Sequence, residues 1–522
     1  MSSTRAVKWQ QFRDSRVISM IFLGFTAGLP LLLIFSSLSL WLREAGVARD
    51  AVTFFSWAAL GYSFKFLWAP LIDRLPVPLL TRQLGRRRAW LLVAQFAIIS
   101  AIVLMASIDP ARGAESLTQM ALAAVLLGFS AATQDIVIDA YRIEIAPPEL
   151  QALLSAVYIA GYRVGMVVAG AGALTLAAWF GSTTEIYSYA AWQTTYLIMA
   201  ALVLIGVFTT LLIQAPDLKS PQPPFSKGGL PDYPPAAYLR LLAVFGVTAA
   251  AFVLMFFLSN QAFIAMKAGA GAGALTHFLL ELLHFALALI AAGCTGWVLV
   301  KVGAVNRTLA QETWIAPAQD FFRRYGLNTA LLLLALIGLY RISDIVLGVI
   351  ANVFYQDLGF TKPQIAAAVQ TFGVVVSIGG GLLGGLLATR HGVMRILLLG
   401  AVLSAATNLI FVVLAHTGAN VPLLYLAVGA DNLAAGLASA AFIAFLSSLT
   451  NISFTAVQYA IFSSLMTLLP KLLGGYSGAM VANLGYPGFF LFTTLIGVPV
   501  IGLVWLAGRR LALNEPTLRT NP

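Results

Sequence analysis

Charged residues and cysteine are both scarce in this 522-residue chain. Asp, Glu, Lys and Arg make up 10% of the residues, whereas hydrophobic residues make up 60%. A soluble protein of this length needs far more polar surface, so the composition excludes a soluble globular fold. The single cysteine, Cys294, excludes a disulfide framework and a cysteine-based zinc cluster. With a mean hydropathy of +0.89, the chain is predicted to be an all-α polytopic membrane protein.

The net charge of +11 raises the question of a nucleic-acid partner. Its basic residues, however, cluster in short loops between apolar runs, as in the stretch that contains Arg86, Arg87 and Arg88. This distribution is typical of cytoplasmic loops under the positive-inside rule. We therefore expect the lipid bilayer, and not nucleic acid, to be the partner that this charge serves.

The apolar runs predict about fourteen transmembrane spans. Six of them form a first half, two are inserted, and six form a second half, with a basic loop after the second span of each half. Two related six-span halves are typical of the major facilitator architecture, with a site at the midplane between the halves. Because the number of spans is even, both termini are predicted to be cytoplasmic. The predicted spans are 17–42, 51–75, 89–108, 117–145, 152–180, 191–213, 236–266, 275–301, 327–355, 364–389, 393–416, 422–449, 454–483 and 486–507.

These spans divide the chain into seven predicted parts. A linker rich in Pro, Gly and Ser separates the first half from the inserted pair, and an amphipathic cytoplasmic segment precedes the second half. Gly24, Gly28 and Pro30 in the first span allow close helix packing and a possible break that exposes backbone to a cavity, and a plain small-residue packing face is an equal alternative. The parts are the N-terminal segment 1–16, the first half 17–214, the linker 215–235, the inserted pair 236–301, the amphipathic segment 302–326, the second half 327–508 and the tail 509–522.

Asp135, Asp139 and Arg142 share one helical stripe in the fourth span, at i, i+4 and i+7. An acid at the centre of a bilayer costs about 2.5–3.5 kcal/mol, so such residues face a bundle interior or a water-filled path. We interpret Asp135 and Asp139 as candidates for proton coupling. Two alternatives remain open, a structural ion network and an Arg142 that only marks the membrane interface. In the second half, Asp344 and Asp431 are the corresponding candidates, for which a structural ion pair is an equal alternative.

Asp73, Arg74 and Arg86 belong to a loop similar to the major facilitator motif G-x-x-x-D-R-x-G-R-R. Ala69 replaces the first glycine here, and PVPLLTRQL separates DR from GRRR. We predict that these three residues form a conformational latch between the halves. The alternative is a basic loop that only sets the topology.

Metal and catalytic sites are not expected. His277, Glu281 and His284 share a helical face, but a polar face near the membrane surface explains them better than a metal site does. There is no nucleophile elbow, HExxH or other strong catalytic motif. The chain is therefore predicted to be a transporter without a metal or a catalytic residue.

Several stretches resemble the AmpG family of muropeptide permeases: GFTAGLP, KFLWAPLIDR, GRRRAWLL, TQDIVIDAYR, GYRVGM, LYRISD and NISFTAVQYAIFSSL. The resemblance implies proton-driven import of N-acetylglucosamine–1,6-anhydro-N-acetylmuramyl peptides across the bacterial inner membrane, for cell-wall recycling, with an indirect role in β-lactamase induction. It implies no cofactor beyond the proton gradient. It also implies roles for Asp135, Asp139, Arg163, Asp344, Asp431 and Gln458. The family often has Glu at position 431 and Arg at position 471.

The implied substrate carries sugars and carboxylates, so side chains of two kinds are candidates to bind it. Arginine and lysine pair with carboxylates, whereas aromatic rings and amides bind sugars. Transport of another solute (a peptide, siderophore or acetyl-CoA-like compound) and a non-transporting membrane receptor remain alternatives. The substrate-binding candidates are Lys65, Gln134, Tyr158, Tyr162, Arg163, Arg341, Gln458 and Lys471, and Trp57 and Tyr62 are weaker sugar candidates.

Overall fold

The computed structural model describes residues 13–47, 62, 64–183, 186–216, 233–269 and 274–518. Within these ranges, thirteen helices are long and apolar enough to cross a membrane. Residues 51–61 and 63 of the predicted second span, 51–75, lie outside the described residues, as do 1–12 and most of the linker. The described part of the chain consists of helices and the connections between them and contains no strand, which confirms the predicted all-α fold.

The first half contains five long described spans. The first is α1 (Ser15–Leu32), which continues through the π-helix η2 (Leu33–Ser37) into α2 (Leu38–Glu44), and the fourth described span is likewise divided by a π-helix. The remaining elements are η4 (Lys65–Leu67), α5 (Ala69–Arg74), α6 (Leu80–Leu84), α7 (Arg86–Ala106), η5 (Pro110–Arg112), α8 (Ala114–Ile145), α9 (Pro148–Val167), η6 (Val168–Gly172), α10 (Ala173–Trp179) and α11 (Tyr189–Leu212).

The second half contains six spans. Three of them depart from the predicted bounds, namely 327–355, 454–483 and 486–507. The predicted span 327–355 is interrupted at Tyr340 and Arg341, and the predicted span 454–483 already ends at Gly474. Consecutive glycines stop that helix, and its continuation after Ser477 bends at Gly485, where φ is 68°. The elements are α16 (Leu327–Leu339), α17 (Ile342–Asp357), α18 (Lys362–Ile365), η8 (Ala366–Gly373), α19 (Val374–His391), α20 (Val393–Thr417), α21 (Val421–Leu449), η9 (Ile452–Phe454), α22 (Thr455–Gly474) and α23 (Ser477–Leu518).

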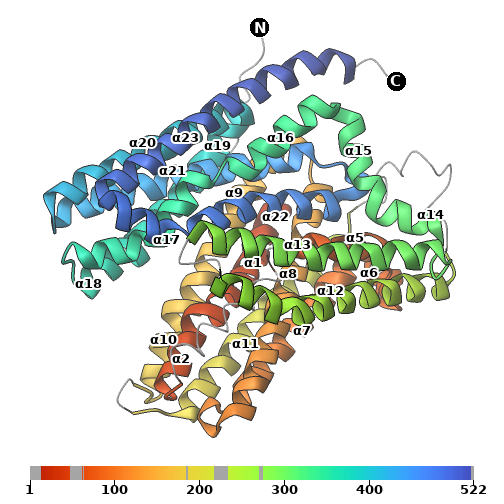
Figure 1. Cartoon of the computed structure of the whole chain (residues 1–522), viewed down its shortest axis with the longest axis horizontal. Helices are drawn as coiled ribbons and strands as arrows, with labels where there is room; N and C mark the ends of the chain where they lie inside the picture. Colours follow the sequence, from red (N-terminus) through yellow and green to blue (C-terminus); the bar gives the residue numbers. More distant parts are fainter. Residues whose placement is uncertain are drawn as a thin grey trace. The chain divides into compact units, whose positions relative to one another are not determined.

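Two compact units are present. The first unit contains the described helices of both halves and covers 1–72, 76–220 and 328–522, whereas the second covers 73–75 and 221–327. In the second unit, α12 (Pro235–Gly269) and α13 (Ala274–Lys301) pack side by side (Figure 1). They are followed by α14 (Arg307–Ala310), η7 (Gln311–Ile315) and the amphipathic α15 (Ala316–Tyr325), which buries Phe321.

Glycine lets α1 and α9 pack with their backbones almost in contact. A Cβ atom at Gly28 would lie 2.1 Å from the Tyr162 carbonyl oxygen, and one at Gly161 would lie 2.1 Å from that of Ile21. Because each helix presents small residues to the other, no side chain separates them. The predicted close packing at Gly24 and Gly28 is confirmed, since both positions meet α9 backbone.

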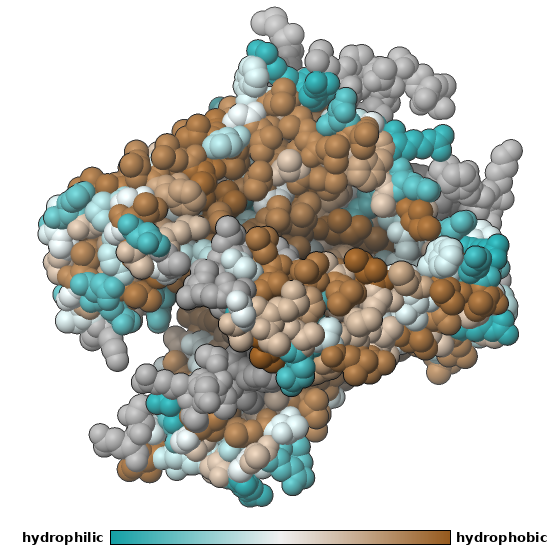
Figure 2. All heavy atoms as spheres, viewed as in Figure 1, coloured by the Kyte–Doolittle hydropathy of each residue, from teal (hydrophilic) through white to brown (hydrophobic). Residues whose placement is uncertain are grey.

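The second half uses the same device between α19 and α21. A Cβ atom at Gly380 or Gly384 would lie within 2.6 Å of an α21 carbonyl oxygen, and one at Gly436 would lie 2.2 Å from the Ser377 carbonyl oxygen. On α19, Gly385 also faces Ala152 of α9, so the same helix joins the two halves. Figure 2 shows hydrophobic residues over the helix flanks and hydrophilic residues gathered near the helix ends, as a bilayer requires.

Candidate functional site

Asp139 lies between two cations in the first half. The Lys65 Nζ is 3.7 Å from Asp139 Oδ2, and the Arg142 Nη2 is 3.4 Å from Asp139 Oδ1. All three side chains are at least nine-tenths buried. The helical stripe predicted that Asp139 and Arg142 share a face, and the fold adds Lys65 from η4. The three residues therefore form a buried ion triad, in which one carboxylate faces two positive charges.

Arg142 connects this triad to the second half of the protein through side-chain contacts. Its Nη1 donates to Ser155 Oγ of α9 and to Ser447 Oγ of α21, both at 2.9 Å. Its guanidinium group lies 5.2 Å from the ring centroid of Tyr459 of α22, within the range of a cation–π contact. Its side chain is fully buried in the last turn of α8, where it has partners in both halves.

Asp135 lies one turn before Asp139 on α8, among tyrosines of α9. Tyr158 donates a long hydrogen bond of 3.5 Å to Asp135 Oδ1, and its ring packs against Tyr162 at 6.1 Å between centroids. Asp135 also interacts electrostatically with Lys65 and Asp139. The neighbouring Gln134 is completely buried, and neither polar atom of its amide has a hydrogen-bond partner among the described residues.

In the second half, Arg341 and Asp344 form an ion pair next to the interruption between α16 and α17. Arg341 Nε lies 3.1 Å from Asp344 Oδ2, and its Nη1 donates to Ser439 Oγ of α21 at 2.7 Å. Asp431 of α21 is close enough to interact with both charges. Arg163, near the C-terminal end of α9, lies within electrostatic range of Arg341, so the two guanidinium groups repel each other. One arginine from each half therefore flanks the same region.

Two further candidates, Gln458 and Lys471, are far from each other on α22. Thirteen residues separate them, or about 20 Å along a helix. Gln458 is buried, and its Oε1 accepts a 2.8 Å hydrogen bond from the Asn451 backbone, which fixes the start of α22. The Lys471 side chain is exposed. These positions do not bring Gln458 and Lys471 together in one site.

The halves also meet where α7 and α22 begin and α8 ends, which we call the basic end. There Arg87 forms a bidentate ion pair with Glu144, with a shortest distance of 2.5 Å. Arg87 Nη2 also donates to Thr455 Oγ1 at 2.8 Å, and Thr455 in turn donates to Glu144. Our sequence analysis assigned no such role to Arg87, Glu144 or Thr455. A glutamate at the end of an apolar span, opposite the GRRR stretch, was the available signal.

The predicted latch residues are not those that form the contact between Arg87, Glu144 and Thr455. Arg74 Nη1 lies 3.4 Å from Glu312 Oε2, within the second unit, and its Nη2 donates to the Glu312 carbonyl oxygen at 3.2 Å. Asp73 is buried, and Arg86 is the residue before Arg87 at the start of α7. A latch role for Asp73, Arg74 and Arg86 stays a prediction.

His284 has an aromatic environment. Its ring lies between those of Phe256 and Phe263, at centroid distances of 4.1 and 4.5 Å, and its Nε2 is 2.9 Å from the Phe256 carbonyl oxygen. The side chains of His277 and Glu281 lie outside the described part of the structure. Among the side chains described, no group of three or more His, Cys, Asp or Glu residues is arranged to hold a metal ion.

Comparison with known proteins identifies the architecture. The sequence model of the Major Facilitator Superfamily matches residues 17–315, more than half of the chain. The chain belongs to the major facilitator superfamily. Two solved structures support this fold at low identity. The proton:xylose symporter XylE bound to 6-bromo-6-deoxy-D-glucose has a TM-score of 0.58 at 13% identity, covering 95% of this chain and 96% of that one. FucP in the outward conformation has a TM-score of 0.55 at 12% identity, covering 94% and 97%.

Curated relatives in this superfamily confirm the resemblance that the motifs predicted. A protein named Putative transporter AmpG 4 from Rickettsia conorii is 27% identical over 94% of this chain and 96% of its own length. A protein named Anhydromuropeptide permease from Escherichia coli strain K12 is 29% identical over 98% of this chain and 83% of its own length. The chain is therefore a multi-pass membrane transporter and not an enzyme.

Proposed function

We propose that this transporter imports anhydro-muropeptides, which are disaccharides of N-acetylglucosamine and 1,6-anhydro-N-acetylmuramic acid that carry a peptide. The observation that carries the proposal is the similarity over nearly the whole chain to relatives with permease names of this class. Arg163 and Arg341, one from each half, are cations within electrostatic range of each other. Two guanidinium groups in close proximity repel each other, and an anionic ligand between them removes that repulsion. The peptide of a muropeptide supplies such carboxylates, and relatives over nearly the whole chain bear permease names of this class.

We propose alternating access as the mechanism, with the basic end at the cytoplasmic face of the inner membrane. The contacts of Arg87 and Arg142 hold the halves together at that end, which suits a state that receives substrate from the periplasm. Opening towards the cytoplasm then requires these contacts to break. Cytoplasmic termini follow from this orientation, and the import direction follows from the order of the two states.

We propose that protons drive this cycle and that no other cofactor takes part. In the ion triad, the single negative charge of Asp139 faces the two positive charges of Lys65 and Arg142 and offsets one of them. A proton on Asp139 leaves both cations without their carboxylate, which destabilises the position from which Arg142 holds Ser447. Asp135 is the next acid along α8, and Asp344 and Asp431 occupy the equivalent role in the second half. An anionic substrate cancels the charge of one proton, so either more than one proton enters or the pH gradient supplies most of the driving force.

Uptake of a labelled anhydro-muropeptide into proteoliposomes tests the function, with and without an inward proton gradient. We expect accumulation that depends on the gradient and disappears with a protonophore. Asp135→Asn and Asp139→Asn should still bind the substrate but lose accumulation against a gradient, while the matched variant Asp320→Asn of α15 should accumulate normally. Uptake of unrelated peptides in preference to muropeptides would contradict the substrate, and protonophore-insensitive accumulation would contradict the coupling.

A further inference from the structure

One face of α17 carries polar side chains at both of its ends, and we call this face the polar stripe. Its C-terminal end lines a hollow. Arg341, Asp344, Asn352 and Gln356 recur at i, i+3, i+11 and i+15, so they lie within about 120° of one another around the helix axis. Between the two polar ends of this stripe lie Ile345, at i+4, and Gly348, at i+7. The charged pair at one end of α17 therefore shares a face with two carboxamides at the other end.

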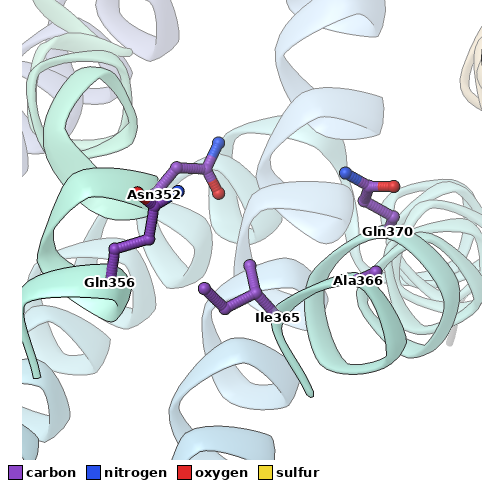
Figure 3. A pocket seen from close by; sticks show the side chains of 5 residues that line it. All are labelled: Asn352, Gln356, Ile365, Ala366 and Gln370. Carbon is purple, nitrogen blue, oxygen red and sulfur yellow. The ribbon is translucent and has the colours of Figure 1, made fainter. Parts of the chain in front are cut away.

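The hollow at the far end has a volume of about 350 Å³. Asn352 and Gln356 line it from α17, and Gln370 lines it from η8, together with Ile365 and Ala366. Figure 3 shows the Asn352 and Gln370 carboxamides directed towards each other from opposite sides of this space. All three carboxamide side chains are exposed. A carboxamide within a span is stable where it meets water and not lipid, so this hollow is an aqueous one.

Its chemistry suits a neutral, hydroxyl-rich ligand. None of the five lining residues carries a charge, and each carboxamide offers two N–H donors and a carbonyl acceptor. Such groups match the hydroxyl and acetamido groups of a sugar, whereas a free carboxylate finds no cation here. Gln370 lies on a π-helix, a rare conformation that is frequent at functional sites and changes the direction of the side chains along the span.

Length along α17 relates this hollow to the charged pair. Asn352 lies about 16 Å from Arg341 along the helix, and Gln356 lies about 22 Å away. An extended peptide spans at most about 3.3–3.6 Å per residue, so about five residues bridge the shorter distance. A sugar in the hollow can therefore present an attached peptide to Arg341 along the same polar stripe.

We propose that the hollow formed by Asn352, Gln356 and Gln370 is the binding site for the sugar part of the substrate. This proposal rests on the proposed function and adds an orientation to it. The neutral disaccharide binds at the far end of α17, and its peptide extends along the stripe until a carboxylate meets Arg341 and Arg163. Recognition of the two chemical parts is thereby divided between the two ends of one helix.

Binding to the full-length transporter in lipid nanodiscs tests this orientation with three ligands: the disaccharide with its peptide, the disaccharide alone and the peptide alone. Asn352→Ala and Gln370→Ala should each raise the Kd for both sugar-containing ligands about tenfold and leave the Kd for the free peptide within about twofold. Arg341→Ala should instead raise the Kd for the free peptide and leave the Kd for the disaccharide alone nearly unchanged. Gln193→Ala, a carboxamide variant in the first half, should change none of them.

The outcomes of this experiment distinguish failure of the proposed orientation from failure of the proposed function. Because Asn352 lies in a regular α-helix, its variant keeps the test informative if the π-helical Gln370 variant does not fold. The inference is overturned if the folded Asn352 variant binds the disaccharide as wild type does, or loses free-peptide affinity to the same extent. If wild-type protein binds the disaccharide–peptide but the carboxamide variants match it, the orientation fails and the proposed function stands. If wild-type protein binds none of the three ligands, both fail.

Discussion

The two halves share a topology but connect their buried charges differently. In the first half, Arg142 joins the Asp139 triad to Ser447 and Tyr459 of the other half. In the second half, Arg341 pairs with Asp344 three residues away and donates to Ser439 of its own half. Arg142 is fully buried, whereas the Arg341 side chain keeps 22% of its surface exposed.

This difference indicates a division of labour, by which we mean that Arg142 and Arg341 have different roles in the two halves. A fully buried arginine with partners in both halves resists their separation, because its hydrogen bonds must break when they move apart. A partly exposed arginine paired within one half can exchange its partner for a ligand without rearranging the helices. The first half therefore supplies the contact that closes the basic end, and the second half supplies a ligand-facing charge.

The largest expected effect compares Arg142→Ala with Arg341→Ala. Removing Arg142 leaves Asp139 with only one cation and two serines without their donor, so we expect destabilisation of about 3–5 kcal/mol and loss of transport. Arg341→Ala removes the cation beside the buried Asp344 but breaks no printed contact between the halves, so we expect a smaller loss of stability than for Arg142→Ala, together with weaker substrate binding. Thermal unfolding in nanodiscs and uptake measure the two effects. Equal stability losses would contradict the division of labour.

Glycine packing should show no such asymmetry. Gly28→Ala and Gly436→Ala place a Cβ atom 2.1 Å and 2.2 Å from a carbonyl oxygen of the partner helix. Both should therefore destabilise the protein by about 1–3 kcal/mol, measured as a lower unfolding temperature. Gly379→Ala is the matched control on α19, because a Cβ atom there meets no described atom within 4 Å. A stable Gly28→Ala protein with a destabilised Gly436→Ala protein would break the symmetry.

The contact at the basic end should be energetically coupled between the halves. In a double-mutant cycle, Arg87→Ala and Thr455→Val should be non-additive by about 0.5–3 kcal/mol, because Arg87 and Thr455 share the Glu144 carboxylate. The corresponding cycle for Arg341 and Ser439 reports coupling within one half only. Additive losses at Arg87 and Thr455 would show that this contact does not hold the halves together.

The smallest effect concerns the first helix of each half. Asp14 caps α1 through the Arg16 backbone N–H, whereas α16 follows Gly326, which has a φ of 71°. The Arg16 side chain hydrogen-bonds to Asp14 and lowers the pKa of that carboxyl. A lowered pKa means that the ionised carboxylate stabilises the folded state above about pH 4 and that this contribution is lost as the pH falls further.

Asp14→Ala should therefore cost about 1 kcal/mol at neutral pH and nearly nothing at pH 2. Unfolding temperatures of the variant and the wild type at the two pH values measure the difference. A constant difference between them would show that the cap does not depend on the charge of Asp14.

Periodicity and composition predicted the features that depend on neighbouring residues in the chain. The apolar runs identified the helices because a bilayer demands about 20 apolar residues per span. The spacing of Asp135, Asp139 and Arg142 placed them on one face because a helix repeats every 3.6 residues. The interruption at Tyr340 and Arg341 was not predicted, since neither residue is a glycine or a proline.

The sequence by itself determined the membrane class, the two six-span halves, the basic loops and the helical stripe of charges. Only the tertiary structure decided which charges meet: that Lys65 completes the Asp139 triad, that Arg142 reaches a serine 305 residues away, and that Arg87 and not Arg74 bridges to Thr455. The physical reason is that helical periodicity is a local property of the chain. Partners such as Ser447 and Thr455 are neutral residues that become visible only when the packed helices bring them against a buried charge.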